Sequence, residues 1–411
     1  MTRASAILML LAVGCVACQS TTGPTTMPTT KPATTTTTST APTALEKRFQ
    51  AELDRARGEL GFPGATAAYA LSDGTVGVAA SGLADVESRA PMTPRSRMLA
   101  ASVGKSFVAA VALALDQEGA LDLDAPIQTW LSDRPWLARL PNHDSITLRH
   151  LLTHSSGLPD HVHTPRFARA VAKRWKEPGN PFPPEALIEY VLDEPARFPA
   201  GGGWSYSDTG YILVGLIIEQ VARRPYYEEL QQRFLAPLGL DATTPSDQRA
   251  LPGLAAGYTA RDNPLGLPAK TTSAPGMMSW DPAVEWTGGG LVSTSRDLAV
   301  WARALYEGRA LSKPYLDELL HSVPVGGVDS GVRYGAGVAI HQQTPLGPSY
   351  GHGGTIPGYV SSLRYYPDRH VAVAFQISTD VGLDDAVGHI ERRLADVVVA
   401  RKQQVERPAG D

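Results

Sequence analysis

Residues 100–115, AASVGKSFVAAVALAL, contain two short motifs that predict different chemistry. Gly104-Lys105-Ser106 matches the end of a phosphate-binding loop, whereas Ser102 and Lys105 form a Ser-x-x-Lys pair. A phosphate-binding loop needs an earlier glycine, five positions before Gly104, because that glycine makes the turn that aims backbone N–H groups at phosphate. Leu99 occupies that position, so the sequence argues against a phosphate-binding loop.

The Ser-x-x-Lys pair fits an activated nucleophile. Apolar residues recur at four-residue spacing from Val103 to Leu115, which predicts a buried helix that begins at Ser102. Residues three apart share a helix face, so we expect Lys105 beside Ser102. A serine hydroxyl becomes a good nucleophile when a neighbour takes its proton. Burial and the positive end of the helix dipole both lower the pKa of a lysine, which favours that role.

Two later segments contain further candidate site residues. WSYSDTGYILVG places Tyr206 and Asp208 on a loop before an apolar helix, and YGHGGTIPGYVSSLRYYP places His352, Gly353 and Gly354 ahead of a strand. With these three motifs in this order, the chain resembles the serine hydrolases of the class C β-lactamase and D-alanyl-D-alanine peptidase family, which includes related esterases. That family's signature is Ser-x-x-Lys, then Tyr-x-Asn, then a Lys/His-x-Gly strand. The resemblance covers about residues 45–405.

The resemblance implies roles for individual residues. Ser102 would attack a carbonyl carbon and form an acyl-enzyme, with Lys105 and Tyr206 sharing the task of general base. The backbone N–H groups of Ser102 and Thr355 would form the oxyanion hole. Gly353 and Gly354 would leave room for the substrate along their strand, and His352 would bind substrate or support its surroundings. The resemblance implies neither a metal nor an organic cofactor.

Two departures from the family's pattern leave the substrate open. Asp208 stands where the family has asparagine, and an ionised carboxylate would pair with Lys105 and raise its pKa. His352 and Gly353 stand where relatives that grip a substrate carboxylate often have lysine and threonine, and a neutral imidazole is a weak anion site. We therefore expect a serine hydrolase of small esters or amides. A β-lactamase or D-alanyl-D-alanine carboxypeptidase, and a non-catalytic peptidoglycan-binding member of the fold, are the alternatives.

The same fold follows from the pattern of secondary structure. Leu45–Leu60 has helical spacing, and Gly64–Leu71 and Thr75–Leu83 form a strand pair around Asp73-Gly74. Further strands are predicted at residues 334–340, 359–366 and 370–377, and a last helix at residues 390–399. Strands at both ends with helices between them predict an α+β fold of three α/β/α layers. Its antiparallel sheet would be formed by both chain ends, with a largely helical inserted subdomain.

The N-terminus predicts export. Residues 1–18 have a basic start, a short apolar run and small residues before Cys15, as in a lipoprotein signal segment, and Cys18 is a second candidate for the lipidated position. Residues 19–44 form a Thr/Pro-rich linker that lacks apolar side chains to bury. We expect an extracytoplasmic bacterial lipoprotein, anchored to a membrane by lipid on Cys15. Its net charge of −4 does not suggest a nucleic-acid partner.

Two other patterns suggest different sites. Residues 347–351, GPSYG, match the nucleophile elbow of α/β-hydrolases, but that elbow needs a helix directly after the serine, and a glycine-rich strand is predicted there. Four histidines between residues 150 and 163, with Asp160, suggest zinc. The resemblance assigns this stretch to a structural loop, so the sequence predicts no metal site.

Overall fold

A computed structural model describes residues 41–175, 182–327, 330–383 and 386–405 of the chain. The signal segment, both cysteines and nearly all of the linker lie outside the described residues, so lipidation at Cys15 stays a prediction. Within the described residues no helix is both long and apolar enough to cross a membrane.

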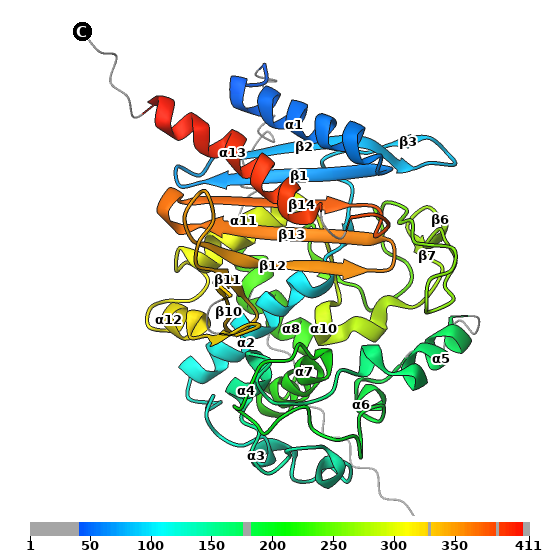
Figure 1. Cartoon of the computed structure of the whole chain (residues 1–411), viewed down its shortest axis with the longest axis vertical. Coiled ribbons are helices and arrows are strands. Elements are labelled where there is room, and N and C mark those ends of the chain that lie inside the picture. The colour runs from blue at the N-terminus through cyan, green and yellow to red at the C-terminus, as the bar shows by residue number, and fades with distance from the viewer. Residues whose placement is uncertain (1–40, 176–181, 328–329, 384–385, 406–411) are drawn as a thin grey trace, which may run out of the picture. The chain divides into compact units, whose positions relative to one another are not determined.

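The largest sheet is antiparallel and is formed by both ends of the folded unit (Figure 1). Its strand order is β3-β2-β1-β14-β13-β12-β11-β10-β9. The N-terminal strand β1 pairs with the C-terminal strand β14, from Ala65 opposite Ile377 to Leu71 opposite Val371. The strands are β1 (Gly64–Leu71), β2 (Val76–Asp85), β3 (Ala90–Pro91), β9 (Val323–Pro324), β10 (Val332–Tyr334), β11 (Ala339–His341), β12 (Ser349–Ile356), β13 (Tyr359–Tyr366) and β14 (Val371–Ile377).

Helices cover both faces of this sheet, as expected for three layers. On one face, α1 (Ala44–Leu60) and α13 (Val387–Val405) enclose an apolar cluster in which Phe49 meets Tyr69 edge to face. On the other face, α2 (Lys105–Gln117) and α11 (Ser295–Tyr306) belong to a larger core. Strand β1 is rich in alanine because its side chains are buried against helices on both sides.

The segment between the two sheet-forming ends is mostly helical and is centred on the apolar helix α7 (Asp208–Ala222), which the sequence predicts. The remaining helices are α3 (Gln128–Leu131), α4 (Leu148–Leu152), α5 (Pro165–Arg174), α6 (Pro184–Ile188), α8 (Tyr226–Leu230), α9 (Ala236–Leu238), α10 (Trp286–Gly289) and α12 (Tyr315–Leu320). Short turns of helix are η1 (Ala101–Gly104), η2 (Leu137–Arg139), η3 (His161–His163), η4 (Gln231–Leu235), η5 (Pro282–Glu285) and η6 (Pro367–Arg369). Small ladders join β4 (Met98–Leu99), β5 (Thr244–Pro245) and β8 (Leu291–Ser293), and β6 (Thr272–Ala274) with β7 (Met277–Met278).

Two expectations about strands are wrong. The single strand predicted at residues 334–340 is two short strands, β10 and β11, with a turn between them. Gly337 lies in that turn with a φ of +65°, a conformation that favours glycine. His352, Gly353 and Gly354 do not precede a strand but lie within β12.

Candidate active site

The segment that carries Ser102 is held in a strained conformation at the start of α2. Ala101 has a φ of +48°, which is unfavourable for a residue with a Cβ atom. Ser102 follows it within η1, and α2 then begins at Lys105. Gly104 allows η1 to pass close to α10, since a Cβ atom at Gly104 would lie 2.9 Å from the Cα atom of Gly289. The bend and the close packing fix the direction of the Ser102 side chain.

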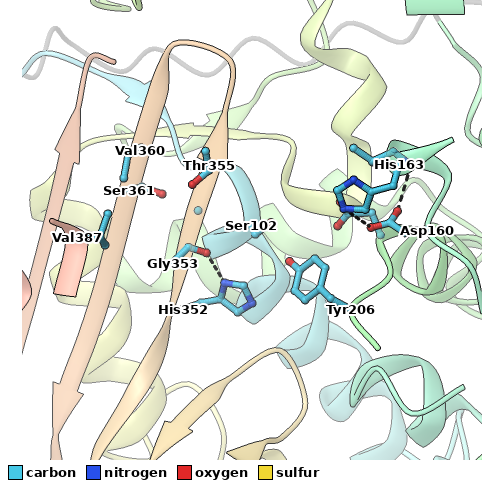
Figure 2. Close-up of a pocket in the computed structure, with 13 residues that line it drawn as sticks. Ser102, Asp160, His163, Tyr206, His352, Gly353, Thr355, Val360, Ser361 and Val387 are labelled. Atoms are coloured by element: carbon cyan, nitrogen blue, oxygen red, sulfur yellow. Dashed lines mark hydrogen bonds and ion pairs between the residues drawn. The ribbon is translucent and has the colours of Figure 1, made fainter. Parts of the chain in front are cut away.

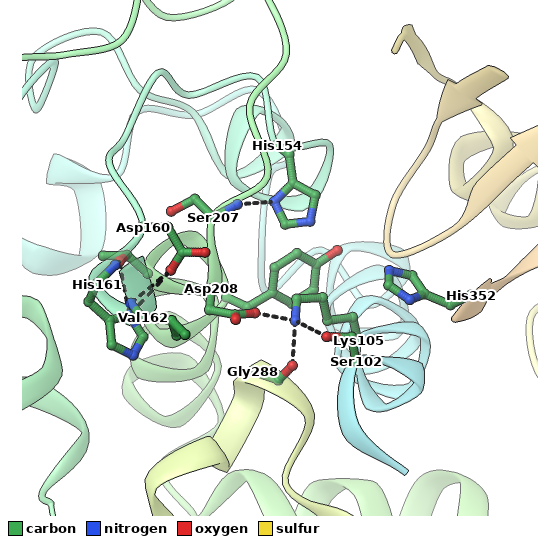
Figure 3. A network of polar contacts seen from close by, with 12 residues as sticks. Ser102, Lys105, His154, Asp160, His161, Val162, Ser207, Asp208, Gly288 and His352 are labelled. Carbon is green, nitrogen blue, oxygen red and sulfur yellow. Dashed lines mark hydrogen bonds and ion pairs between the residues drawn. The ribbon is translucent and has the colours of Figure 1, made fainter. Parts of the chain in front are cut away.

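Lys105 lies at the centre of a polar network (Figure 3). Its side chain is fully buried, and its Nζ atom donates to the Oγ atom of Ser102 at 3.1 Å. The same Nζ atom donates to the carbonyl oxygen of Gly288 and forms an ion pair with Asp208. An ammonium group has three N–H donors, and these three acceptors use all of them. Lys105 is therefore arranged as a protonated lysine that donates toward Ser102.

The electrostatics of the network agree with that protonation state. Burial alone would lower the pKa of Lys105, but the negative charge of Asp208 and the neighbouring Tyr206 raise it above its ordinary value. The expected pairing of Asp208 with Lys105 is thus present in the structure. Burial lowers the pKa of Lys105 as expected, but Asp208 and Tyr206 together raise it by more, so the net shift is upward.

Tyr206 lies beside Ser102 with its hydroxyl group buried in the site. The Nζ atom of Lys105 lies 4.9 Å from the centre of the Tyr206 ring. The Tyr206 hydroxyl is buried beside Lys105 and Ser102, and hydrogen bonding to these two side chains favours its anionic form. Burial raises the pKa of Tyr206 above its ordinary value, although the positive charge of Lys105 opposes this effect. A hydroxyl placed in this way is available to a bound substrate or to Ser102.

A cavity of about 370 Å³ opens beside these residues. Figure 2 shows Ser102 and Tyr206 between two walls, with β12 on one side and Asp160 and His163 on the other. The lining residues are Ser102, Asp160, Val162, His163, Tyr206, Asp208, His352, Gly353, Gly354, Thr355, Val360, Ser361 and Val387. The cavity thus includes every predicted site residue except Lys105, which lies beneath it, and Cys15.

Strand β12 approaches η1 closely because Gly354 has no side chain. A Cβ atom at Gly354 would lie 2.5 Å from the carbonyl oxygen of Ala100 and 2.5 Å from the Oγ atom of Ser361. Ser361 in β13 donates to the same Ala100 carbonyl at 2.6 Å. This contact places Thr355 and Ser102 on one cavity, which the predicted oxyanion hole requires. Because β11 pairs with β12 only as far as Gly351, the edge of β12 beyond it is free of strand partners among the described residues.

His352 belongs to a chain of hydrogen bonds that determines its proton position. Its Nδ1 atom contacts the carbonyl oxygen of Gly353, so Nδ1 carries the proton. Burial and the charge of Lys105 lower the pKa of His352 to about 3, so the ring is neutral and its Nε2 atom accepts from the Tyr334 hydroxyl at 2.7 Å. Tyr334 in turn accepts from the Nε2 atom of His154 at 3.2 Å, and the Nδ1 atom of His154 accepts from the backbone N–H of Ser207 at 3.2 Å.

Both nitrogen atoms of His352 are therefore engaged within the protein. The chain from Ser207 through His154 and Tyr334 joins the loop that carries Tyr206 to strand β12. Tyr334 was not predicted as a site residue, because a position within a predicted strand gives no sign of this contact. His352 lines the cavity and supports β12, and it has no free nitrogen for a substrate carboxylate.

The residues that suggested a nucleophile elbow or a zinc site have structural roles. Ser349 begins strand β12 and is not part of a strand-to-helix elbow. The histidines between residues 150 and 163 lie in different surroundings, since His150 caps α4, His154 joins Tyr334, and His161 bonds the Thr209 hydroxyl at 3.0 Å. Within the described ranges, no three His, Cys, Asp or Glu side chains lie together as metal ligands.

Comparison with known proteins agrees with this arrangement. Residues 45–397 match the family model described as Beta-lactamase. Esterase EstB of Burkholderia gladioli is 28% identical over 87% of this chain and 96% of its own length. Penicillin-binding protein 4* of Bacillus subtilis is 25% identical over 72% of this chain, which spans only 63% of that protein. The structure of D-amino acid amidase from Ochrobactrum anthropi SV3 complexed with L-phenylalanine amide superposes with a TM-score of 0.71, at 26% identity over 89% of this chain and all of that one.

Proposed function

The chain belongs to the beta-lactamase family, and we propose that it is a serine hydrolase that cleaves esters or amides through an acyl-enzyme on Ser102. The observation that carries the proposal is the 3.1 Å hydrogen bond between Lys105 Nζ and Ser102 Oγ at the floor of the cavity. A non-catalytic binding protein has no need of a buried lysine held against a serine that directly follows the strained residue Ala101.

The proposed reaction uses the groups in the cavity. The reacting form of Tyr206 is the phenolate, which the protonated Lys105 stabilises; Ser102 attacks the substrate carbonyl and its proton passes to this phenolate. Tyr206 then returns the proton to the leaving group. The N–H groups of Ser102 and Thr355 stabilise the oxyanion, and water hydrolyses the acyl-enzyme. Because Lys105 already donates to three acceptors, we assign the base to Tyr206 and the electrostatic support to Lys105.

The charges around the cavity favour substrates without a carboxylate. His352 is neutral and both of its nitrogens are bonded. Arg364, a cationic side chain of the neighbouring strand β13, pairs with Glu391 of α13 at 3.2 Å, on the face of the sheet opposite the α2 core. β-Lactams and D-alanyl peptides carry a carboxylate that these residues do not pair. We therefore propose an esterase or amidase in preference to a β-lactamase or D-alanyl-D-alanine carboxypeptidase.

A labelling and turnover experiment tests the proposal. The residue 45–405 domain should react with a fluorophosphonate probe and hydrolyse p-nitrophenyl esters faster than nitrocefin or D-Ala-D-Ala peptides. Ser102→Ala should abolish labelling and hydrolysis without loss of folding, whereas Ser349→Ala should retain both. Labelling that persists in Ser102→Ala would contradict the assignment of the nucleophile. Faster turnover of nitrocefin or D-Ala-D-Ala peptides would contradict the substrate class.

We also propose that the protein works outside the cytoplasm, held to a membrane by lipid on Cys15. The support is the pattern of residues 1–18 and the polar linker that follows them. A single lipid chain gives weak membrane binding, and stable anchoring needs more than one, as in a fully processed lipoprotein.

A further inference from the structure

The cavity beside Ser102 continues past strand β12 to the other face of the sheet. Its lining includes Val360 in β13 and Val387, the first residue of α13, as well as Ser102 and Tyr206. Val360 belongs to the apolar cluster beneath α1 and α13, and Val387 packs against that cluster. In Figure 2, Gly353 lies between Ser102 and Val387. The cavity therefore joins the nucleophile to an apolar region across β12.

Gly353 leaves this passage open. Side chains alternate between the two faces of a strand, and a Cβ atom at Gly354 would point at Ala100, so residue 353 faces the α13 side. Apart from the chain neighbours of Gly353, the atom nearest to a Cβ atom placed there would be the Ser361 carbonyl oxygen at 3.9 Å. Strand β11 pairs with β12 only as far as Gly351, so among the described residues no strand covers this edge. A side chain at residue 353 would occupy the passage without displacing the backbone.

The two sides of the cavity differ in polarity. Both carboxylates that line it, Asp160 and Asp208, belong to the helical segment. Of the described residues, β13 and α13 contribute uncharged side chains to the lining: Val360, Ser361 and Val387. Arg364 and Glu391, further along the α13 face, pair with each other at 3.2 Å and do not line the cavity. An apolar group of the substrate would therefore gain from burial on this side.

The position of Tyr206 indicates which part of the substrate reaches this side. Tyr206 protonates the leaving group in the proposed reaction, so the leaving group departs beside its ring. The ring centre of Tyr206 lies 6.1 Å from that of His352, the residue before Gly353. The leaving group therefore departs beside the part of β12 where the passage begins.

We propose that the passage over Gly353 to Val360 and Val387 is a subsite for an apolar leaving group, so that the enzyme prefers esters of longer alcohols. This inference rests on the proposed function of Ser102. The bond between the acyl carbon and the alcohol oxygen breaks as Ser102 forms its own ester with the acyl carbon. The alcohol takes the Ser102 proton by way of Tyr206 and leaves from the subsite before water hydrolyses the acyl-enzyme.

The test compares esters that are isomers of each other. Butyl acetate and ethyl butyrate contain the same atoms, but the longer chain is in the leaving group of the first and in the acyl group of the second. Titration of the released acid at constant pH gives kcat/KM for both isomers and for ethyl acetate. We expect a gain of about threefold per buried methylene, hence about tenfold from ethyl to butyl acetate, and a smaller gain from ethyl acetate to ethyl butyrate.

Three variants place the preference in the passage. Gly353→Val should remove the gain from ethyl to butyl acetate, because its side chain would fill the passage. Val387→Asn should reduce the gain by making the far end polar. Val381→Asn is the control and should keep the wild-type gain, since Val381 is 52% exposed and does not line the cavity. Each gain is a ratio of two substrates within one protein, so a change in the folded fraction does not affect it.

Equal kcat/KM for butyl acetate and ethyl butyrate in wild type would overturn the subsite, and this comparison needs no variant. A ratio of butyl to ethyl acetate that stayed at the wild-type value in either Gly353→Val or Val387→Asn would also overturn it. These failures would leave Ser102-dependent turnover of ethyl acetate in wild type. Failure of the proposed function would instead appear as no Ser102-dependent turnover of any ester.

Discussion

Asp208→Asn should lower the pH at which the enzyme becomes active. Asp208 is the negative partner of a fully buried lysine, and its charge raises the pKa of both Lys105 and Tyr206. The substitution removes that charge and leaves the burial of Lys105, which lowers the lysine's pKa. Whichever of the two groups accepts the proton of Ser102, its basic form becomes easier to reach.

The expected size follows from the contact. A charge in direct contact with a titrating group moves its midpoint by about one to three pH units. In wild type, log kcat/KM for a p-nitrophenyl ester should therefore still be rising at about pH 9, the upper end of a practical window. In Asp208→Asn the rise should move down by about one to three pH units. At any fixed pH where the wild-type kcat/KM is still rising with pH, the kcat/KM of Asp208→Asn should therefore be about tenfold higher or more.

The assay measures kcat/KM across about pH 6 to 9 for a p-nitrophenyl ester and for nitrocefin. The asparagine amide can donate to an acyl carbonyl, which a carboxylate cannot, so the ratio of nitrocefin to ester turnover should also increase. Asp281→Asn, at the start of η5, is the control for neutralising an aspartate at a helix start. The reasoning would be refuted if kcat/KM rose over the same pH range in Asp208→Asn as in wild type and the ratio of nitrocefin to ester turnover were unchanged. Asp208 would then have a structural role and would not set the pKa values of Lys105 and Tyr206.

Two further variants test the support of the site. Gly354→Ala should lower the melting temperature and the activity, because its methyl group would overlap the Ala100 carbonyl. Gly353→Ala is the control and should melt like wild type, since the atom nearest to its methyl group would be 3.9 Å away. Equal melting temperatures of the two variants would contradict the close approach of β12 to η1. His352→Gln should reduce the loss of stability in acid. With a pKa of about 3 when folded and about 6.5 when unfolded, His352 stays neutral in the folded state while the unfolded state binds a proton. As the pH falls from about 6 to about 4, the free energy of unfolding of wild type should therefore decrease by about 1.4 kcal/mol per pH unit more than that of the variant. If the two proteins lost stability in parallel, His352 would not be a buried, neutral side chain in the folded state.

Local patterns predicted the sheet well where turns were explicit. The strand at Gly64–Leu71 has the predicted bounds because Asp73-Gly74 sets the end of the hairpin, and Tyr359–Tyr366 is bounded by the Pro367-Asp368-Arg369 turn. The strand predicted at residues 334–340 failed because its alternating apolar residues concealed a turn. A Cβ atom at Gly335 would lie 2.4 Å from the Leu319 carbonyl, a tertiary contact that no local pattern contains.

The site was predictable only where side chains carry the chemistry in short motifs. Ser102, Tyr206 and Asp208 meet as expected. Gly288 was missed because it contributes a backbone carbonyl, which any residue type could supply. Tyr334 was missed because its partners His154 and His352 are distant in sequence and meet it only after the sheet and the helical segment pack together.

The replacement of asparagine by Asp208 also bears on the substrate. A buried, unpaired ammonium at Lys105 would attract a substrate carboxylate and repel a substrate amine, at an energy that grows as the site loses water. Pairing with Asp208 cancels that field where the acyl part of the substrate would lie. The pairing therefore leaves the cavity without a strong attraction for a substrate carboxylate, which agrees with the proposed preference for neutral esters and amides over β-lactams and D-alanyl peptides.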